Sequence, residues 1–243
     1  EGRPDTALRE GVQAPVNDPL LIIPSMAQAT EHLGFAVTCN LSHEPPLPFA
    51  RRMTTLDHLT GGRIGWNVVT GYLDSGAKGA GRAGQVSHDV RYDIAEEFMQ
   101  IQYGFWEGSW EEGAVLANRQ SGVYADASKV HLVKHKGPQY QVQAMHLAEP
   151  SPQRTPLLYQ AGSSPRGSRF AATHAECVFL NGQSMPGVKA IVEGIRGQAV
   201  AQGRLASDIQ VWMGATIITA ATDAQAQEKF EEYKRYASSE GAL

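Results

Sequence analysis

The feature that most constrains the fold of this chain is a set of short runs that are apolar throughout, separated by segments with helical spacing. Strands that lack a polar face are typical of a parallel sheet that helices cover. The pattern therefore predicts an α/β fold with about five parallel strands, whereas a closed TIM-type (β/α)8 barrel needs eight. The predicted strands are 35–41, 64–70, 157–161, 177–180 and 209–218.

Helices are predicted between these strands, because apolar side chains recur there every three or four residues. Residues 71–84 form a glycine-rich loop, and residues 1–17 are polar and indicate a loop or a frayed helix. The predicted helices are 19–32, 48–59, 89–106, 165–174, 188–202 and 223–236.

Residues 107–154 interrupt this alternation. Two short stretches, 130–135 and 139–142, flank a Gly-Pro pair, a combination typical of a β-hairpin. We therefore expect one domain over residues 1–243 that carries an insertion at about 107–154. The chain opens on Glu1 and closes soon after a charged helical stretch, so we also expect further sequence on both sides.

Composition narrows the class of protein. The 21 Lys and Arg against 25 Asp and Glu give a net charge of −4, and the absence of a long basic run argues against a nucleic-acid partner. The longest apolar runs are too short to span a bilayer. Cys39 and Cys177 both lie inside apolar runs, which fits a reducing cytoplasm better than a disulfide framework.

Two predicted helix starts are candidate anion sites. A strand enters a tight turn and then a helix at 157–167, where Ser164 is a suitable N-cap and Arg166 a further donor. At the second start, His88 and Tyr92 are four residues apart and point the same way. Plain capping explains the first motif about equally well, and a solvated helix start explains the second somewhat better.

Polar residues in or at the end of two apolar strands are a third candidate. Asn67 and Thr70 lie in the run 64–70, and Thr38 has a similar place in the preceding strand. Barrel enzymes place function at the carboxyl ends of their strands, although hydrogen bonding to a neighbouring strand is an equally ordinary role. The histidines at 131, 135 and 146 have no carboxylate at metal-ligand spacing, so we predict no metal site.

Taken together, several segments resemble one protein family and occur in its order and spacing from about Gln13 onward. The segments are Pro15–Pro19, Ala50–Arg52 with Thr55–Thr60, Gly62–Thr70, His88–Asp89 with Arg91–Asp93, Trp106–Trp110 and Pro150–Pro156.

The family is the nitrilotriacetate and dibenzothiophene-sulfone monooxygenase group of the luciferase-like flavoproteins, which also includes long-chain alkane and dimethyl-sulfide monooxygenases. The resemblance implies a TIM-type barrel that is incomplete in this chain, with our five strands as its third to seventh. It also implies an FMN site at the carboxyl end of the barrel. The implied cofactor-binding residues are Thr38, Asn67, Thr70, His88, Tyr92, Ser163 and Ser164.

The resemblance further places Gln13 near the substrate pocket, and Tyr72 where an alkane-oxidising relative has a histidine. It implies a cytoplasmic homo-oligomer that inserts one oxygen atom from O2 into an organosulfur or other apolar small molecule. Reduced FMN would come from a separate NAD(P)H-dependent reductase. The catalytic residues stay unassigned.

Several alternatives remain. Within the family, the substrate is a long alkane or an aminopolycarboxylate, or the chain is an inactive flavin-binding fragment. A phosphate-binding aldolase or isomerase is a further alternative, although we find no catalytic Lys or acid pair at a strand end.

Overall fold

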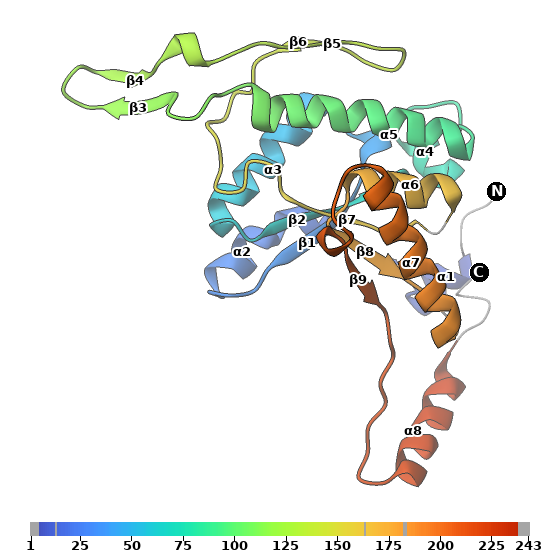
Figure 1. Ribbon diagram of the computed structural model, residues 1–243. Coiled ribbons are helices and arrows are strands. Elements are labelled where there is room, and N and C mark those ends of the chain that lie inside the picture. Colours follow the sequence, from blue (N-terminus) through green and yellow to red (C-terminus); the bar gives the residue numbers. More distant parts are fainter. Residues whose placement is uncertain (1–4, 13, 163, 182–183, 238–243) are drawn as a thin grey trace. The chain divides into compact units, whose positions relative to one another are not determined.

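The computed structural model describes residues 5–12, 14–162, 164–181 and 184–237. The chain divides into two compact units, one of residues 22–213 and one of residues 1–21 with 214–243 (Figure 1). The prediction of a single domain stays a prediction. Among the described residues, no helix has the length and apolarity that crossing a membrane requires.

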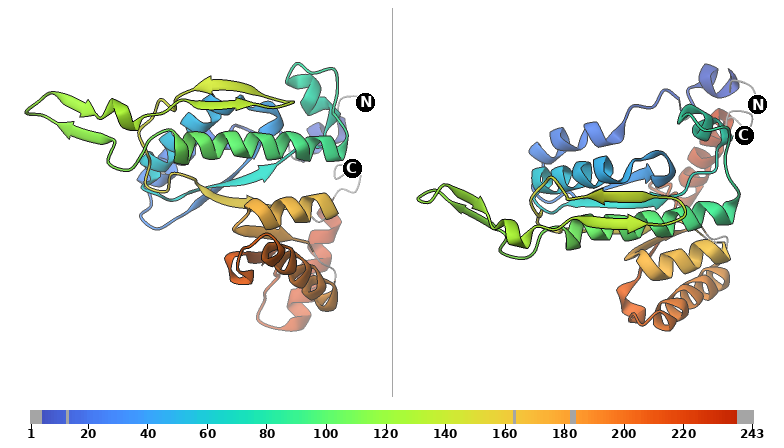
Figure 2. Two further views of the ribbon diagram at one scale, coloured as in Figure 1. Left: turned by 45° about the horizontal axis from the view of Figure 1, so that its top comes forward. Right: turned by 90° about the horizontal axis from the view of Figure 1, so that it is seen from above.

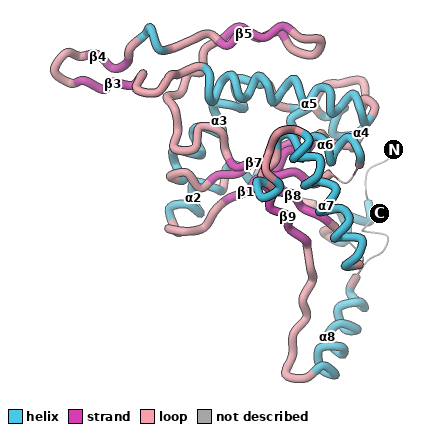
Figure 3. Tube along the Cα trace, in the orientation of Figure 1, coloured by secondary structure: helices cyan, strands magenta, loops and turns pink. Residues whose placement is uncertain are grey.

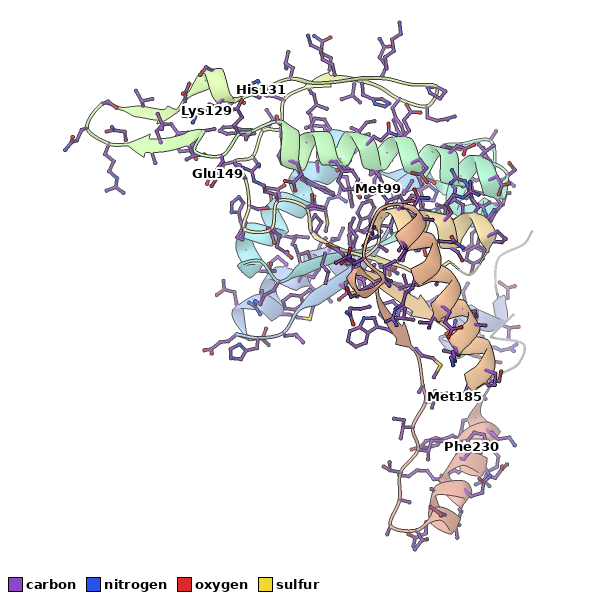
Figure 4. All side chains as sticks on the ribbon, viewed as in Figure 1. Met99, Lys129, His131, Glu149, Met185 and Phe230 are labelled. Atoms are coloured by element: carbon purple, nitrogen blue, oxygen red, sulfur yellow. The ribbon has the colours of Figure 1, made fainter. Side chains whose placement is uncertain are left out.

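The smaller unit contains short helical elements and one regular helix. The predicted last helix is present as α8 (Asp223–Tyr236), and the Thr222 side chain caps it by accepting a hydrogen bond from the backbone N–H of Gln225. Its apolar side chains stay exposed, among them Phe230 (Figure 4). The other elements are α1 (Asp5–Glu10) and η1 (Pro19–Leu21).

The larger unit is built on a five-stranded sheet in which every neighbouring pair is parallel, as the sequence predicts. The largest boundary error is in the last strand, which ends at Met213 instead of Ile218, whereas the other strand ends differ by at most one residue. Its neighbour in the sheet, β8, ends at Leu180, which pairs with Met213, so the pairing of these two strands stops there. In sheet order the strands are β1 (Phe35–Asn40), β2 (Ile64–Val69), β7 (Leu157–Gln160), β8 (Cys177–Leu180) and β9 (Gln210–Met213).

Helices cover one face of this sheet (Figure 2). Trp66 of β2 packs against Phe49, Phe98 and Trp106, with ring centroids 4.6–6.3 Å apart. The predicted helix 19–32 is shorter than expected, because Pro24 can lie only in the first turn of α2 and Ala29 ends it. The helices of this unit are α2 (Ile23–Gln28), α3 (Pro46–Thr60), α4 (Asp74–Gly79), α5 (His88–Tyr103), α6 (Pro165–His174) and α7 (Met185–Ala201).

The other face of the sheet is open. Thr38 is exposed on β1, and its register places it beside Asn67 of β2 and then Tyr159 of β7. Farther along this face, Phe179 is 41% exposed and its partner Trp212 is 53% exposed. The uniformly apolar strands are therefore covered on one side only among the described residues.

The insertion holds two β-hairpins where the sequence predicts one (Figure 3). The missed hairpin has strands too short and too exposed to leave an apolar signature. The loop at 71–84 also contains α4, and a π-helical turn, η3 (Gly104–Gly108), extends α5. The remaining elements are β3 (Val115–Asn118), β4 (Val123–Ala125), β5 (Val133–Lys136), β6 (Gln141–Ala144), η2 (Leu41–His43), η4 (Ala127–Lys129) and η5 (Ala206–Asp208).

The carboxylate of Glu97 fastens the β5–β6 hairpin to α5. It accepts hydrogen bonds from His135 Nε2 at 2.8 Å and from the backbone N–H groups of Gln139 at 3.0 Å and Tyr140 at 2.7 Å. Burial opposes ionisation, but these hydrogen bonds outweigh it and hold the pKa of Glu97 below its usual value. The ionised form is therefore the one that stabilises the hairpin.

We expect Glu97→Gln to lower the free energy of unfolding at pH 7 by roughly 2 kcal/mol, because the amide cannot accept all of these hydrogen bonds. A carboxylate with a lowered pKa stabilises the fold above its unfolded pKa, and this stability is lost as the pH falls through the folded pKa. The difference between wild type and variant should thus shrink below about pH 4 in urea titrations. The exposed Glu112→Gln is the control, with a change of about 0.5 kcal/mol or less. An equal effect at pH 3 and pH 7 would contradict this assignment.

Candidate functional site

A cavity of about 410 Å³ lies at the carboxyl ends of β1, β2 and β7. Parallel strands bring these ends, and the starts of the helices that follow, to one edge of the sheet. The lining residues are Thr38, Val68, Val69, Thr70, Gly71, Tyr72, His88, Arg91, Tyr92, Gln160 and Ala161.

The strand side of the site presents polar groups on the open face of the sheet. Asn67 Nδ2 donates to Thr38 Oγ1 at 2.9 Å, which fixes the direction of the amide. The amide oxygen of Asn67 is buried and has no hydrogen-bond partner among the described residues. An acceptor in this state lacks the donor that buried polar groups ordinarily have. Thr70 lines the same cavity.

The helix side joins two starts that are 76 residues apart in the sequence. His88, the first residue of α5, lies 3.1 Å by its Nε2 from the Oγ of Ser164, the N-cap of α6. Ser164 Oγ also accepts from the backbone N–H of Gly167 at 3.0 Å, and His88 Nδ1 lies 2.7 Å from Asp89 Oδ1. His88 and Ser164 also line a second hollow of about 600 Å³, so His88 stands between two cavities.

Tyr92 lies next to His88 on α5, with ring centroids 5.1 Å apart. Burial raises the pKa of the Tyr92 phenol, which stays a neutral hydrogen-bonding group. Gln160 Nε2 lies 3.4 Å from the Tyr92 hydroxyl, and Gln160 Oε1 accepts from the backbone N–H of Gly162 at 2.7 Å. The sequence analysis missed Gln160, although a buried glutamine in the otherwise mostly apolar strand 157–161 was a usable signal.

Two glycines let the backbone approach the Tyr92 hydroxyl. A Cβ atom at Gly162 would lie 2.9 Å from that oxygen, and one at Gly167 would lie 2.7 Å from it. Both distances are too short for a carbon atom without movement of the ring. The absence of side chains at these positions therefore keeps the turn before α6 and its first N–H groups close to the cavity.

Arg166, one of the candidate donors, lines the neighbouring 600 Å³ hollow with His88 and Ser164 and is absent from the wall of the 410 Å³ cavity. Its guanidinium donates to Asp93 at 2.9 Å and to Glu96 at 3.2 Å, two carboxylates on one face of α5. His174 Nε2 lies 2.8 Å from the other oxygen of Glu96. Burial opposes ionisation of Glu96, but these partners hold its pKa below the usual value. Arg166 therefore binds α6 to α5.

The remaining candidates differ in position. Tyr72 lies at the rim of the cavity with 78% of its surface exposed. Gln13 and Ser163 lie outside the described residues.

The histidines of the insertion have other partners. Within the described part of the chain, no cluster of His, Cys, Asp and Glu is placed to hold a metal. His131 pairs with Glu111 at 2.6 Å near the base of the β3–β4 hairpin (Figure 4), and His146 Nε2 lies 2.9 Å from Thr54 Oγ1. Burial, with a smaller contribution from Arg51, lowers the pKa of His146 to about 4, so this imidazole is neutral at pH 7.

Comparison with known proteins identifies the family. Residues 5–241 match the family described as luciferase-like monooxygenase. The chain belongs to this family.

Within the luciferase-like monooxygenases, the chain is 50% identical over 239 residues to a long-chain alkane monooxygenase of Geobacillus thermodenitrificans, which covers 98% of the chain and 54% of that protein. It is 48% identical over 242 residues to a dimethyl-sulfide monooxygenase of Hyphomicrobium sulfonivorans, covering 100% and 50% respectively. A riboflavin lyase solved with modified FMN and riboflavin has a TM-score of 0.95 and 41% identity, covering 99% of the chain and 54% of that structure. The chain thus spans about half the length of these relatives.

The close approach at Gly167 yields a stability test. A glycine inside a helix ordinarily costs about 0.5–1 kcal/mol relative to alanine. At Gly167 the added Cβ meets the Tyr92 hydroxyl, so we expect Gly167→Ala to lower the free energy of unfolding by about 1–3 kcal/mol.

The control is Gly197→Ala in α7, where a Cβ meets nothing within 4 Å and the gain of the ordinary helix is expected. Urea denaturation measures both variants. Equal stabilisation by the two alanines would contradict this prediction, because it would show that a Cβ atom at position 167 fits beside the Tyr92 hydroxyl.

Proposed function

We propose that this chain is the FMN-binding part of a flavin-dependent monooxygenase. The observation that carries the proposal is the meeting of His88 and Ser164, which brings two helix N-termini to one point beside the cavity. Helix N-termini and hydroxyl or imidazole donors are suited to a phosphate group. The family supports the same cofactor, since one structural relative was solved with modified FMN.

The residues present fit a flavin. The unpartnered Asn67 amide oxygen is an acceptor for a ring N–H, and Thr38 holds that amide in position. At the other end, His88, Tyr92 and Ser164 supply hydrogen-bond donors, and the missing side chains at 162 and 167 leave the turn open to a phosphate. We assign the ring to Thr38, Asn67 and Thr70, and the phosphate to His88, Tyr92, Ser163 and Ser164.

In the complete protein, bound reduced FMN would supply the chemistry that activates O2, with one oxygen atom inserted into the substrate. The chain's residues bind and orient the cofactor and limit the access of water to it. A separate NAD(P)H-dependent reductase would provide the reduced FMN. The five strands would be the third to the seventh of a barrel whose other strands cover the open face of the sheet.

We propose an organosulfur or other apolar small molecule as substrate. A dimethyl-sulfide monooxygenase at 48% identity supports this class, and a long-chain alkane monooxygenase at 50% identity supports the alkane alternative. Tyr72 is the proposed pocket residue, and Gln13 is a further one by the family resemblance alone. Cys39 and Cys177 are both buried, and we propose a cytoplasmic homo-oligomer.

Ser164→Asp should weaken FMN binding at least about tenfold, because the new carboxylate repels the phosphate. Aspartate is itself a good N-cap, so the helix start should persist. Flavin fluorescence quenching measures the Kd.

The matched control is Ser184→Asp. Ser184 caps α7 with the same hydrogen bond to the N–H three residues later, in a sequence that also has proline in the first turn and glycine at the third position. This variant should bind FMN as the wild type does. Equal Kd values for all three proteins would remove Ser164 from the proposed phosphate site.

Tyr72→Phe removes one hydroxyl at the rim of the cavity. We expect it to lower the rate of sulfone oxygenation severalfold, because the phenol can donate to a sulfone oxygen, and to leave alkane oxidation nearly unchanged. Product formation is measured with reduced FMN from an added flavin reductase.

Omitting the reductase is the control, and NADH alone should not support turnover. Equal rates without it would contradict the two-component assignment. FMN binding without turnover on any of these substrates would favour the inactive flavin-binding alternative.

A further inference from the structure

The 410 Å³ cavity and the neighbouring hollow differ in the charged residues of their walls. The lining residues of the 410 Å³ cavity include Arg91 and His88, and no Asp or Glu is among them. The neighbouring hollow differs, since it holds Asp89 as well as Arg166 and Arg169. A cavity with a cation and no acid in its wall favours an anionic group of a ligand.

Arg91 keeps hydrogen-bonding capacity that the described residues do not use. Its Nη1 donates to the backbone carbonyl of Val86 at 3.0 Å, and its Nε is buried without a partner. Arg166, in contrast, is neutralised by Asp93 and Glu96. Arg91 lines the cavity and has a buried Nε without a partner among the described residues, which indicates an acceptor that arrives with a ligand.

The position of Arg91 indicates which group of the ligand would provide this acceptor. Arg91 follows His88 by three residues, so the two side chains lie on the same face of the first turn of α5. His88 in turn contacts Ser164 at the start of α6. An anion that binds His88 from the side of the 410 Å³ cavity would therefore lie beside Arg91, which lines the same wall. Guanidinium groups bind phosphate oxygens in pairs of parallel hydrogen bonds.

We propose that Arg91 binds the phosphate of the flavin together with His88, and that it selects FMN over riboflavin. This inference rests on the proposed function, which assigns the phosphate only to His88, Tyr92, Ser163 and Ser164. It adds the positive charge that balances the phosphate, a role that neutral hydroxyl and N–H donors cannot fill.

The test compares the Kd of FMN and of riboflavin for wild type, Arg91→Met, Arg91→Lys and Arg119→Met. Arg119 is exposed on the β3–β4 hairpin and supplies an equal change of net charge away from the cavity. We expect Arg91→Met to raise the Kd of FMN at least about tenfold and that of riboflavin less than twofold. Arg91→Lys should restore part of the loss, and Arg119→Met should change neither value.

Other outcomes overturn the inference. Equal weakening of both flavins by Arg91→Met would place the guanidinium at the ring or in a structural role. A loss specific to FMN in Arg169→Met, without one in Arg91→Met, would assign the charge to the neighbouring hollow.

Failure of the proposed function is separable from failure of this inference. If the wild type binds neither flavin, the proposed function fails, and calorimetry with inorganic pyrophosphate then tests Arg91 directly. Binding by wild type that Arg91→Met abolishes supports the anion site, and the absence of binding by wild type overturns it. Circular dichroism confirms that each variant is folded.

Discussion

The site depends on one constraint of parallel sheets: every connection must return to the same edge before the next strand begins. The carboxyl ends of β1, β2 and β7 therefore lie together, and the helices that follow β2 and β7 begin beside them. This is why His88 and Ser164 meet at 3.1 Å although 76 residues and two hairpins separate them. The side chains add chemistry to a position that the topology already determines.

The packing of α6 on α5 then fixes the distance between the two helix starts. Arg166 and His174, near the two ends of α6, both contact Glu96, and Tyr103 OH lies 3.0 Å from the other nitrogen of His174. These contacts are partly buried, and the removal of one partner from a buried ion pair costs more than it does at the surface. Because each contact joins the same two helices, a movement of α6 along α5 would break several of them at once. These contacts between α5 and α6 thus position Ser164 at the start of α6.

Sequence reasoning succeeded where local chemistry decides the structure and failed where a distant partner decides it. Apolar runs identified all five sheet strands, and capping residues marked the starts of α5 and α6. The end of β9 was wrong because it is set by the length of β8. The ion pairs of Arg166 were not predicted because Asp93 and Glu96 reach it only through helix packing. Gln160 was overlooked because its partner, Tyr92, lies 68 residues away.

The two ends of the proposed flavin site differ in how far the described residues enclose them. His88, Tyr92 and Ser164 belong to the larger unit and are held by contacts within it, so the proposed phosphate end is formed by this chain alone. The ring end is different, because Thr38 lies on a sheet face where Phe179 and Trp212 are also exposed. Large apolar side chains that are exposed together usually mark a face to which another protein segment or a ligand binds. Under the proposed function, that cover would enclose the ring and shape the substrate pocket, so anchoring of the cofactor and choice of substrate would reside in different parts of the protein.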